Sequence, residues 1–493
     1  MRQIIILLIL AFLLPITAFA WSDDFSGGYD FEVDSIYYEI ISQTPPKVRV
    51  CSKAWWKIDE VKDYSSNYSG DLMIPCDVTY DGVTYTVTDI CWNAFMGCSD
   101  LKSITIPASI TNITITSYWK DFNYGVLTSG SNGVKSIKVV GNSIFDSRND
   151  CNAIIETMTN KLIAGCDNTT IPNSITSIGT SAFVNCKGLS DLQLPNTITE
   201  IGESAFAGCS NLGAIEIPNS VTYIGSCAFM HSGLISLVLS DSISSISTGT
   251  FYSCNNLKNI EIPSSVTAIG RSSFYACVSL SNVTIPNSVT IIEDNAFDGC
   301  RGFTSVTIPN SVTSIGRAAF SCYDSNIVDV TCKALIPPSI YYNSGSSYDY
   351  NTFNCYNQAT LYIPRDSYVA YRNADGWRQF RNIQSLADLE IDNLYYNFTS
   401  DSTVCVTYKI ENYNSYSGDF VIPESINYDG KDYIVNAIDD KAFYNCSGLT
   451  SITIPNTITA IGSYAFYGCG GLTSVDIPNS DITIGAYAFY ECI

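Results

Sequence analysis

Histidine is nearly absent from this sequence, and charged residues are scarce. Among 493 residues there is one histidine, His231, and charged residues make up 15%, against about 25% in an average soluble protein. A metal site built from several histidines is therefore excluded, and a histidine-dependent catalyst would have to use His231. The sequence around His231 contains no recognisable motif for a nucleophile or for an acid that would orient the imidazole, so we interpret His231 as a surface residue.

Basic residues are the rarer half of the charged set. Lysine and arginine total 25 against 47 aspartates and glutamates, which gives a net charge of −22. Nucleic-acid binding and attraction to anionic membranes both draw on lysine and arginine, so neither is expected.

Long hydrophobic runs are missing, apart from one run at the start of the chain. Residues 4–14 are apolar and follow Arg2, and Ala18-Phe19-Ala20 forms a small-x-small cleavage pattern. This run is too short to span a bilayer, which takes about 20 residues. We interpret residues 1–20 as a secretory signal peptide, with a mature chain that begins at Trp21, is secreted or held at the cell surface, and does not insert into a membrane.

Motifs for metal ions, phosphates and cofactors are also missing. The closest cysteine pair, Cys91 and Cys98, is seven residues apart, whereas zinc sites use pairs two to four apart. No calcium loop or glycine-rich phosphate loop occurs. Paired carboxylates of a glycosidase stay open, without a local signature. The sequence predicts a non-enzymatic protein without a cofactor or a metal.

What the sequence does contain is a repeat of about 23 residues. One unit reads Ala-Phe-x-x-Cys-x-x-Leu-x-x-Val-x-Ile-Pro-Asn-Ser-Val-Thr-x-Ile-Gly, and residues 296–316 match it almost fully. The repeat phenylalanines are Phe183, Phe206, Phe229, Phe251, Phe274, Phe297 and Phe320, followed later by Phe443, Phe466 and Phe489, and Phe95 opens an earlier copy. A period of this length is typical of a solenoid.

Each position in the unit has a physical interpretation. Leu280, Val283 and Ile285 mark a short strand with its apolar side chains inward, and Pro286 ends it because proline cannot donate to a ladder. The Ala-Phe pair is expected on the convex side, in a short helical turn. Because one coil cannot bury its apolar face alone, stacked coils must share a continuous core. The predicted fold is a β-rich solenoid with parallel strand ladders.

These motifs resemble the BspA-like leucine-rich repeats of bacterial surface proteins. The resemblance rests on residues 205–209 (Ala-Phe-Ala-Gly-Cys), 217–222 (Ile-Pro-Asn-Ser-Val-Thr) and 224–225 (Ile-Gly), and on residues 146–157, which precede a hairpin-like insert in this family. It covers most of the mature chain. It implies a leucine-rich repeat solenoid and a role in adhesion, in binding to host or matrix proteins, or in aggregation.

A second internal copy divides the chain into two arrays. Residues 68–98 align with residues 416–446 without a gap, and 15 of the 31 positions are identical. We interpret each copy as part of a β-rich N-terminal cap, which solenoids need to stay soluble. The predicted order is a cap at 21–87, a leucine-rich repeat array at 88–333 with an irregular insert at 113–166, an array-closing cap at 334–387, a second β-rich cap at 388–436, and a second array at 437–493. The sequence stops within a repeat, so two interpretations stay open: a truncated product, which is the simpler one, or a last coil left open to a partner.

Nine of the nineteen cysteines follow the repeat. Those three residues after a repeat phenylalanine are Cys98, Cys186, Cys209, Cys254, Cys277, Cys300, Cys446, Cys469 and Cys492. Neighbouring coils are about 4.8 Å apart, beyond the roughly 3.8 Å that separates Cβ atoms in a disulfide. We therefore predict a ladder of small buried thiols. Disulfides fit better at off-ladder cysteines, such as Cys51 with Cys76 or Cys332 with Cys355.

The outward positions of the first strand in each repeat are the candidate binding face. They are Ser190, Asp191 and Gln193; Glu216; Ile235, Ser236 and Val238; Lys258, Asn259 and Glu261; Ser281, Asn282 and Thr284; and Thr304, Ser305 and Thr307. Solenoids bind through such extended surfaces, and this one is polar and rich in hydroxyls, with Ile235 and Val238 as apolar exceptions. The predicted function is recognition of, or adhesion to, an extracellular protein or other cell-surface macromolecule. A glycan-binding module, which would need aromatic residues in line on one face, and a passive spacer are the alternatives.

Overall fold

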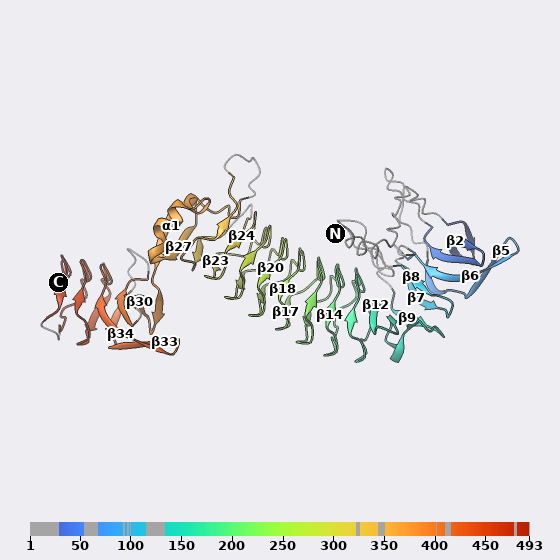
Figure 1. Ribbon diagram of the computed structural model, residues 1–493, viewed down its shortest axis with the longest axis horizontal. Coiled ribbons are helices and arrows are strands. Elements are labelled where there is room, and N and C mark those ends of the chain that lie inside the picture. Colours follow the sequence, from blue (N-terminus) through green and yellow to red (C-terminus); the bar gives the residue numbers. More distant parts are fainter. Residues whose placement is uncertain are drawn as a thin grey trace, which may run out of the picture.

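The chain forms a long row of stacked coils with a β-rich cap at each array start (Figure 1). The computed structural model describes residues 29–53, 68–91, 94–95, 98, 100–114, 134–321, 326–343, 351–400, 402–409, 416–477 and 481–492. The predicted signal peptide, residues 1–20, lies outside them. Within the described residues, no helix is long and apolar enough to cross a membrane. The fold is the predicted leucine-rich repeat solenoid.

Each regular coil has three sides, and the first is a ladder of two-residue strands, named here the short-strand side. These strands hold the Thr-x-Ile-Gly part of the repeat, and they pair in parallel in two ladders, one from β13 to β16 and one from β18 to β26. They are β13 (Ser177–Ile178), β14 (Glu200–Ile201), β16 (Tyr223–Ile224), β18 (Ser245–Ile246), β20 (Ala268–Ile269), β22 (Ile291–Ile292), β24 (Ser314–Ile315) and β26 (Ser339–Ile340).

The second side, named the long-strand side, holds the Leu-x-x-Val-x-Ile part of the repeat. Its strands are β15 (Ala214–Glu216), β17 (Ser236–Val238), β19 (Asn259–Glu261), β21 (Asn282–Thr284), β23 (Ser305–Ile308), β25 (Asp329–Cys332), β27 (Thr360–Pro364) and β28 (Asn382–Leu386). The residues between the exposed ones, such as Ile215, Leu237 and Ile260, are buried. Alternation of inward apolar and outward polar residues therefore places the core between the sides.

The third side, named the turn side, carries the Ala-Phe part of the repeat. It is a run of β-turns and contains no helical turn, which differs from the expectation above. Two residues per coil, such as Ser181 (φ 55°) and Asn185 (φ 58°), adopt the left-handed conformation. The left-handed conformation directs backbone N–H groups of the turn toward the next coil. For example, the N–H of Phe183 donates to the carbonyl of Ala205 at 2.7 Å.

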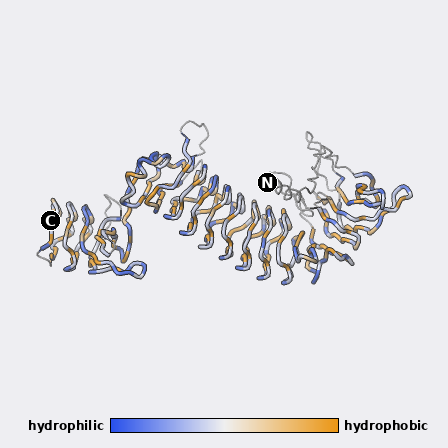
Figure 2. Tube along the Cα trace, viewed as in Figure 1, coloured by the Kyte–Doolittle hydropathy of each residue, from blue (hydrophilic) through white to orange (hydrophobic). Residues whose placement is uncertain are grey.

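The repeat phenylalanines form a continuous stack in the core. From Phe183 through Phe320 to Phe353, successive ring centroids lie 5.1–5.8 Å apart and nearly parallel. Aromatic residues of the caps and of the closing segment pack against three phenylalanines. Tyr68 contacts Phe95, Tyr416 contacts Phe443, and Trp377 and Phe380 contact Phe353. Figure 2 shows the apolar positions that recur along every coil.

The cysteine ladder is confirmed. No disulfide joins the cysteines in the described part of the chain, and those of the repeat are buried or, at Cys492, half-buried. The thiol of Cys277 donates to the backbone carbonyl of Phe251 at 3.1 Å, and Cys209 and Cys300 do the same to Phe183 and Phe274. The alternative disulfides are not formed, because Cys51, Cys76, Cys332 and Cys355 are also free.

Both caps have one topology, as the internal copy suggested. In the first, β1 (Phe31–Val33), β2 (Ile36–Gln43), β3 (Pro46–Cys51), β5 (Asp77–Tyr80), β6 (Val83–Ile90) and β8 (Asn112–Ile113) form one sheet, and β4 (Gly70–Met73), β7 (Leu101–Ile106) and β9 (Ser136–Val139) form another. In the second, the main sheet contains β29 (Leu389–Ile391), β30 (Leu394–Phe398), β31 (Thr403–Thr407), β33 (Ser425–Tyr428), β34 (Lys431–Ile438), β36 (Ala460–Ile461) and β37 (Thr483–Ile484), beside the pair β32 (Gly418–Val421) and β35 (Leu449–Thr453).

The irregular insert contains a hairpin that separates two cores. β10 (Phe145–Asp146), β11 (Ala153–Glu156) and β12 (Lys161–Gly165) pair antiparallel, and β12 then pairs in parallel with β13. Ile154 and Ile163 pack into the core of the first cap, whereas Ile155 and Leu162 pack into the core of the regular coils. Both faces of the hairpin are buried, which explains why its strands are apolar without alternation.

Residues 334–387 lose the sequence repeat but keep all three sides of the coil. β26 extends the short-strand side, β27 and β28 extend the long-strand side, and Phe353 extends the phenylalanine stack. The 3₁₀-helices η2 (Arg365–Ser367) and η3 (Trp377–Gln379) and the helix α1 (Tyr368–Asn373) then cover the end of the core.

A polar cluster joins this closing segment to the second array. The Asp439 carboxylate accepts hydrogen bonds from the guanidinium of Arg365, from Asn397 Nδ2 at 3.4 Å and from Thr407 Oγ1 at 3.1 Å. Arg365 belongs to the first array, and the other three residues belong to the second. This carboxylate therefore ties the two arrays together.

Candidate functional site

Every residue of the predicted binding face is exposed to solvent on the long-strand side. Glu216 lies on β15, Val238 on β17, Asn259 and Glu261 on β19, Asn282 and Thr284 on β21, and Thr307 on β23; Lys258 directly precedes β19. Ser190, Asp191 and Gln193 are exposed but lie outside a strand. The segment before them, residues 166–171, forms turns and offers no strand for them to pair with.

The face consists of rows of equivalent residues on successive coils. Glu216 stands beside Val238, Asn259 beside Asn282, and Glu261 beside Thr284. Two side-chain hydrogen bonds between predicted residues are found here, from Gln193 Nε2 to Asp191 Oδ1 at 3.2 Å and from Ser281 Oγ to the backbone carbonyl of Lys258 at 3.5 Å. Most of these polar groups are therefore left to water or to a partner.

Two apolar side chains interrupt the polar rows. Ile235 is 52% exposed and Val238 is 62% exposed. The Cδ1 atom of Ile235 lies over Gly213, 4.0 Å from where a Cβ would stand there, and Val238 lies between the carboxylate-bearing strands β15 and β19. Most equivalent positions on this face are polar, although Val328, in line with Ile235, is also apolar and 54% exposed.

His231 forms no catalytic arrangement in the described part of the chain. Its ring meets the edge of Tyr252 at 5.7 Å between centroids. Partial burial there lowers the pKa of the imidazole, so the neutral form is favoured. No nucleophile or acid is hydrogen-bonded to its side chain among the described residues, which leaves the interpretation as a surface residue in place.

Carboxylates are found close together in one hollow, on the second cap. It has a volume of about 410 Å³ and is lined by Asp392, Ser417, Asp419 and Phe420 among others. The hydroxyls of Thr450 and Ser451 donate to Asp419 Oδ1 at 2.6 and 2.7 Å and lower the pKa of that carboxyl. A general acid needs a raised pKa, so Asp419 does not have the chemistry of the acid of a glycosidase. Among the described residues, no three metal-ligating side chains lie close enough to hold an ion.

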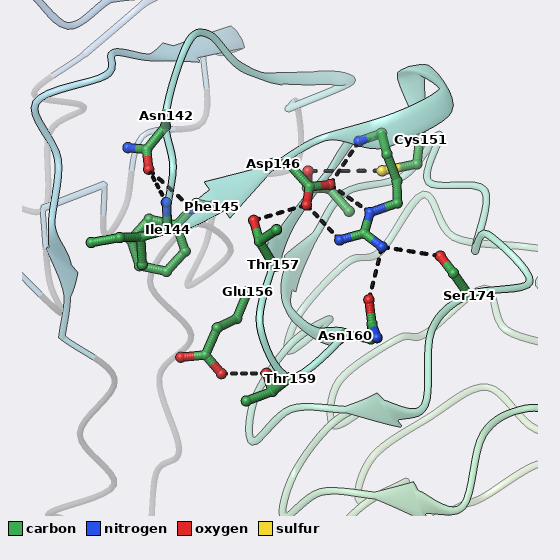
Figure 3. Close-up of polar contacts among 12 residues, drawn as sticks. Asn142, Ile144, Phe145, Asp146, Cys151, Glu156, Thr157, Thr159, Asn160 and Ser174 are labelled. Carbon is green, nitrogen blue, oxygen red and sulfur yellow. Dashed lines mark hydrogen bonds and ion pairs between the residues drawn. The ribbon is translucent and has the colours of Figure 1, made fainter.

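The densest polar network lies beside the insert hairpin and is structural (Figure 3). Arg148 donates to both carboxylate oxygens of Asp146, to Asn160 Oδ1 at 2.8 Å and to Ser174 Oγ at 3.3 Å, and Thr157 Oγ1 also donates to Asp146. Burial raises the pKa of Asp146, but these hydrogen bonds outweigh it and lower the pKa overall. The network pins the hairpin to the first regular coil.

Tyrosines form lines on the turn side of the second array, a feature that the sequence analysis missed. Tyr444, Tyr467 and Tyr490 stack in one row with centroids 5.1 and 5.5 Å apart. Tyr464 and Tyr487 stack in a second row at 5.3 Å. The signal was present in the sequence, because these tyrosines keep the 23-residue period, one position after or two positions before the repeat phenylalanine.

Comparison with protein families identifies the repeat. The model described as BspA type leucine rich repeat region matches in six copies, over residues 76–161, 155–280, 222–349, 267–403 and 420–493. The chain belongs to the BspA-type leucine-rich repeat family. The resemblance stated from the motifs is thereby confirmed. A comparison with curated proteins finds no match.

Solved structures of similar fold come from bacterial leucine-rich repeat proteins. One from Bacteroides ovatus is 21% identical, with a TM-score of 0.36, over 94% of this chain and 93% of that one. A leucine rich cell surface protein from Faecalibacterium prausnitzii is 20% identical, with a TM-score of 0.34, over 91% and 95%. One from Eubacterium ventriosum is 23% identical, with a TM-score of 0.43, over 56% and 67%.

Proposed function

We propose that this BspA-type protein is exported and recognises an extracellular protein through its long-strand side. The exposed pair Ile235 and Val238 carries the proposal. Two apolar residues, each more than half exposed, stand together on a face whose equivalent positions are mostly polar. Binding energy at protein interfaces concentrates in such apolar centres with a polar rim.

The surrounding geometry supports a protein partner over a small molecule. The rows are open and flat along successive coils, and the hollow on the second cap lies elsewhere. A flat surface gives broad contact with a folded protein, whereas a small ligand needs a concave site to bury most of its area. Export is supported by the N-terminal segment, and adhesion by the family's occurrence in bacterial surface proteins.

The test is a solid-phase binding assay with the mature chain, residues 21–493. It would use purified extracellular-matrix proteins and whole cells as immobilised partners. The informative variant combines Ile235→Ser with Val238→Thr, and the matched control is Ile291→Thr. Ile291 is 43% exposed on β22, on the short-strand side.

We expect saturable binding to at least one protein, with a Kd raised tenfold or more in the double variant and unchanged in the control. Tenfold corresponds to about 1.4 kcal/mol, within the usual range for an interface centre. Binding that survives the double variant would refute the long-strand side as the site. A folded mature chain that binds none of the proteins or cells would leave a spacer role instead.

A further inference from the structure

The tyrosine rows of the second array form a surface that the repeat itself does not require. The residues are Tyr444, Tyr467 and Tyr490 in one row and Tyr464 and Tyr487 in the other, and we name them the tyrosine platform. In the first array the position after the phenylalanine holds Val184, Ala207, Met230, Tyr252, Tyr275, Asp298 and Ser321, and the position two before it holds Ser181, Ser204, Cys227, Gly249, Ser272, Asn295 and Ala318. The same fold is thus built there with mostly small side chains.

The platform is continuous and accessible. Between the rows, Tyr464 and Tyr467 lie 5.8 Å apart at 52°, and Tyr487 and Tyr490 lie 5.8 Å apart at 81°. Tyr487 and Tyr490 are 59% and 52% exposed, and the other three are half-buried. Stacking fixes each ring on its neighbour, so that little side-chain entropy is left to lose on binding.

The chemistry of the platform favours a neutral ligand with hydroxyl groups. Each phenol combines an apolar ring with a hydroxyl that both donates and accepts hydrogen bonds. The turn positions in line with the platform carry one cation, Lys441, and one anion, Glu491. Desolvation and the nearby Glu491 carboxylate, to which this phenol is hydrogen-bonded, raise the pKa of Tyr467, so the phenol stays protonated.

The period of the platform favours a polymer over a folded protein. Equivalent rings recur every 5.1–5.5 Å along the array, which is close to the length of one sugar ring in an extended polysaccharide. A ligand made of identical units can repeat the same contact on each coil, whereas a protein surface has no reason to do so. The C–H groups of a sugar ring also pack favourably against the electron-rich aromatic rings.

We propose that the tyrosine platform binds a neutral, extended β-1,4-linked polysaccharide. This site is independent of the long-strand side, since it lies on another side of the coil and in the other array. The protein would then hold two different extracellular ligands, one on each array.

The test is native affinity electrophoresis of the mature chain in gels that contain hydroxyethyl cellulose, galactomannan or soluble starch. The informative variant is Tyr464→Ala with Tyr487→Ala, and Tyr464→Phe with Tyr487→Phe keeps the rings without the hydroxyls. The matched control is Tyr223→Ala, because Tyr223 is 50% exposed on the short-strand side of the first array. Circular dichroism verifies that each variant is folded.

We expect retardation by hydroxyethyl cellulose or galactomannan and none by starch, whose chain is helical. The alanine variant should raise the apparent Kd at least tenfold, the phenylalanine variant less, and the control not at all. Absence of retardation in all three gels, or equal retardation of the alanine variant, would overturn the proposal. If no polysaccharide binds and the alanine variant instead loses binding to a protein, the proposal would be overturned and the platform would be a protein-docking surface. The long-strand variant should leave retardation unchanged, so this proposal and the proposed function can fail separately.

Discussion

The buried thiol ladder predicts that the first array loses stability steeply at alkaline pH. Burial raises the pKa of Cys254 from its ordinary value of 9.0 to about 12, and burial also raises the pKa values of Cys186, Cys209 and Cys277. In the unfolded chain these thiols ionise near pH 9, whereas in the fold they keep their protons. Above pH 9 the unfolded state therefore binds fewer protons than the native state, and stability falls as pH rises.

The size of the effect follows from the number of thiols. Each thiol that stays neutral in the fold removes about 1.4 kcal/mol from the free energy of unfolding at pH 10. The four thiols together remove roughly 6 kcal/mol, a large part of the 5–15 kcal/mol that is typical of a folded domain. Below about pH 8 the thiols are neutral in both states, and no effect is expected.

The assay is urea denaturation at half-unit steps from pH 7 to pH 10, followed by circular dichroism under reducing conditions. Cys277→Ala should reduce the slope of stability against pH by one proton, about 1.4 kcal/mol per pH unit above pH 9. The control is Cys76→Ala, because Cys76 is exposed. A flat profile through pH 10, or an unchanged slope in Cys277→Ala, would refute the reasoning.

Three further predictions concern the stack, the turns and the junction. Phe274→Ala should lower the free energy of unfolding, measured by urea denaturation, by about 3–5 kcal/mol, because the ring is fully buried between two stacked neighbours. A loss below about 1 kcal/mol would contradict a continuous stack. Ala276→Gly should raise the thermal midpoint, by an amount equivalent to about 0.5–1 kcal/mol in the free energy of unfolding. Ala276 adopts the left-handed conformation (φ 55°), and the equivalent residue of the next coil is Gly299. A lowered midpoint would argue against this turn. Asp439→Ala should cost about 1–3 kcal/mol and exceed the cost of Arg365→Ala, because three side-chain donors and the backbone N–H of Asp440 lose their acceptor. The reverse order, measured by hydrogen exchange of β30 and β31, would refute the junction.

The regular part of the solenoid was predictable because its determinants are local and repeated. Alternation along the strand placed Glu216, Val238 and Glu261 outward and Ile215 and Ile260 inward, as the structure shows. Equal spacing of the cysteines placed their thiols on one line, too far apart to bond. The same argument, applied to the tyrosines of the second array, would have found the platform, since their period was visible in the sequence.

The irregular features needed the tertiary structure. Ser181 and Ala276 are left-handed turn residues, and neither is a glycine or an asparagine. The hydrogen bonds that stabilise these turns are made with the next coil. The local sequence therefore does not distinguish such a turn from a helical turn. Phe353 follows Phe320 by 33 residues instead of 23, and stacking alone shows that it continues the core.

The sequence by itself determined the repeat, the inward and outward residues, the thiol ladder and the family, because each of these follows from a period along one chain. Only the tertiary structure decided which segments contact each other where the 23-residue repeat is interrupted. In the folded chain, the hairpin of β11 and β12 packs against two separate cores. Arg365 binds Asp439, which lies 74 residues later in the sequence. Contacts of this kind depend on how two irregular segments close against each other in space, and no spacing within either segment encodes the partner.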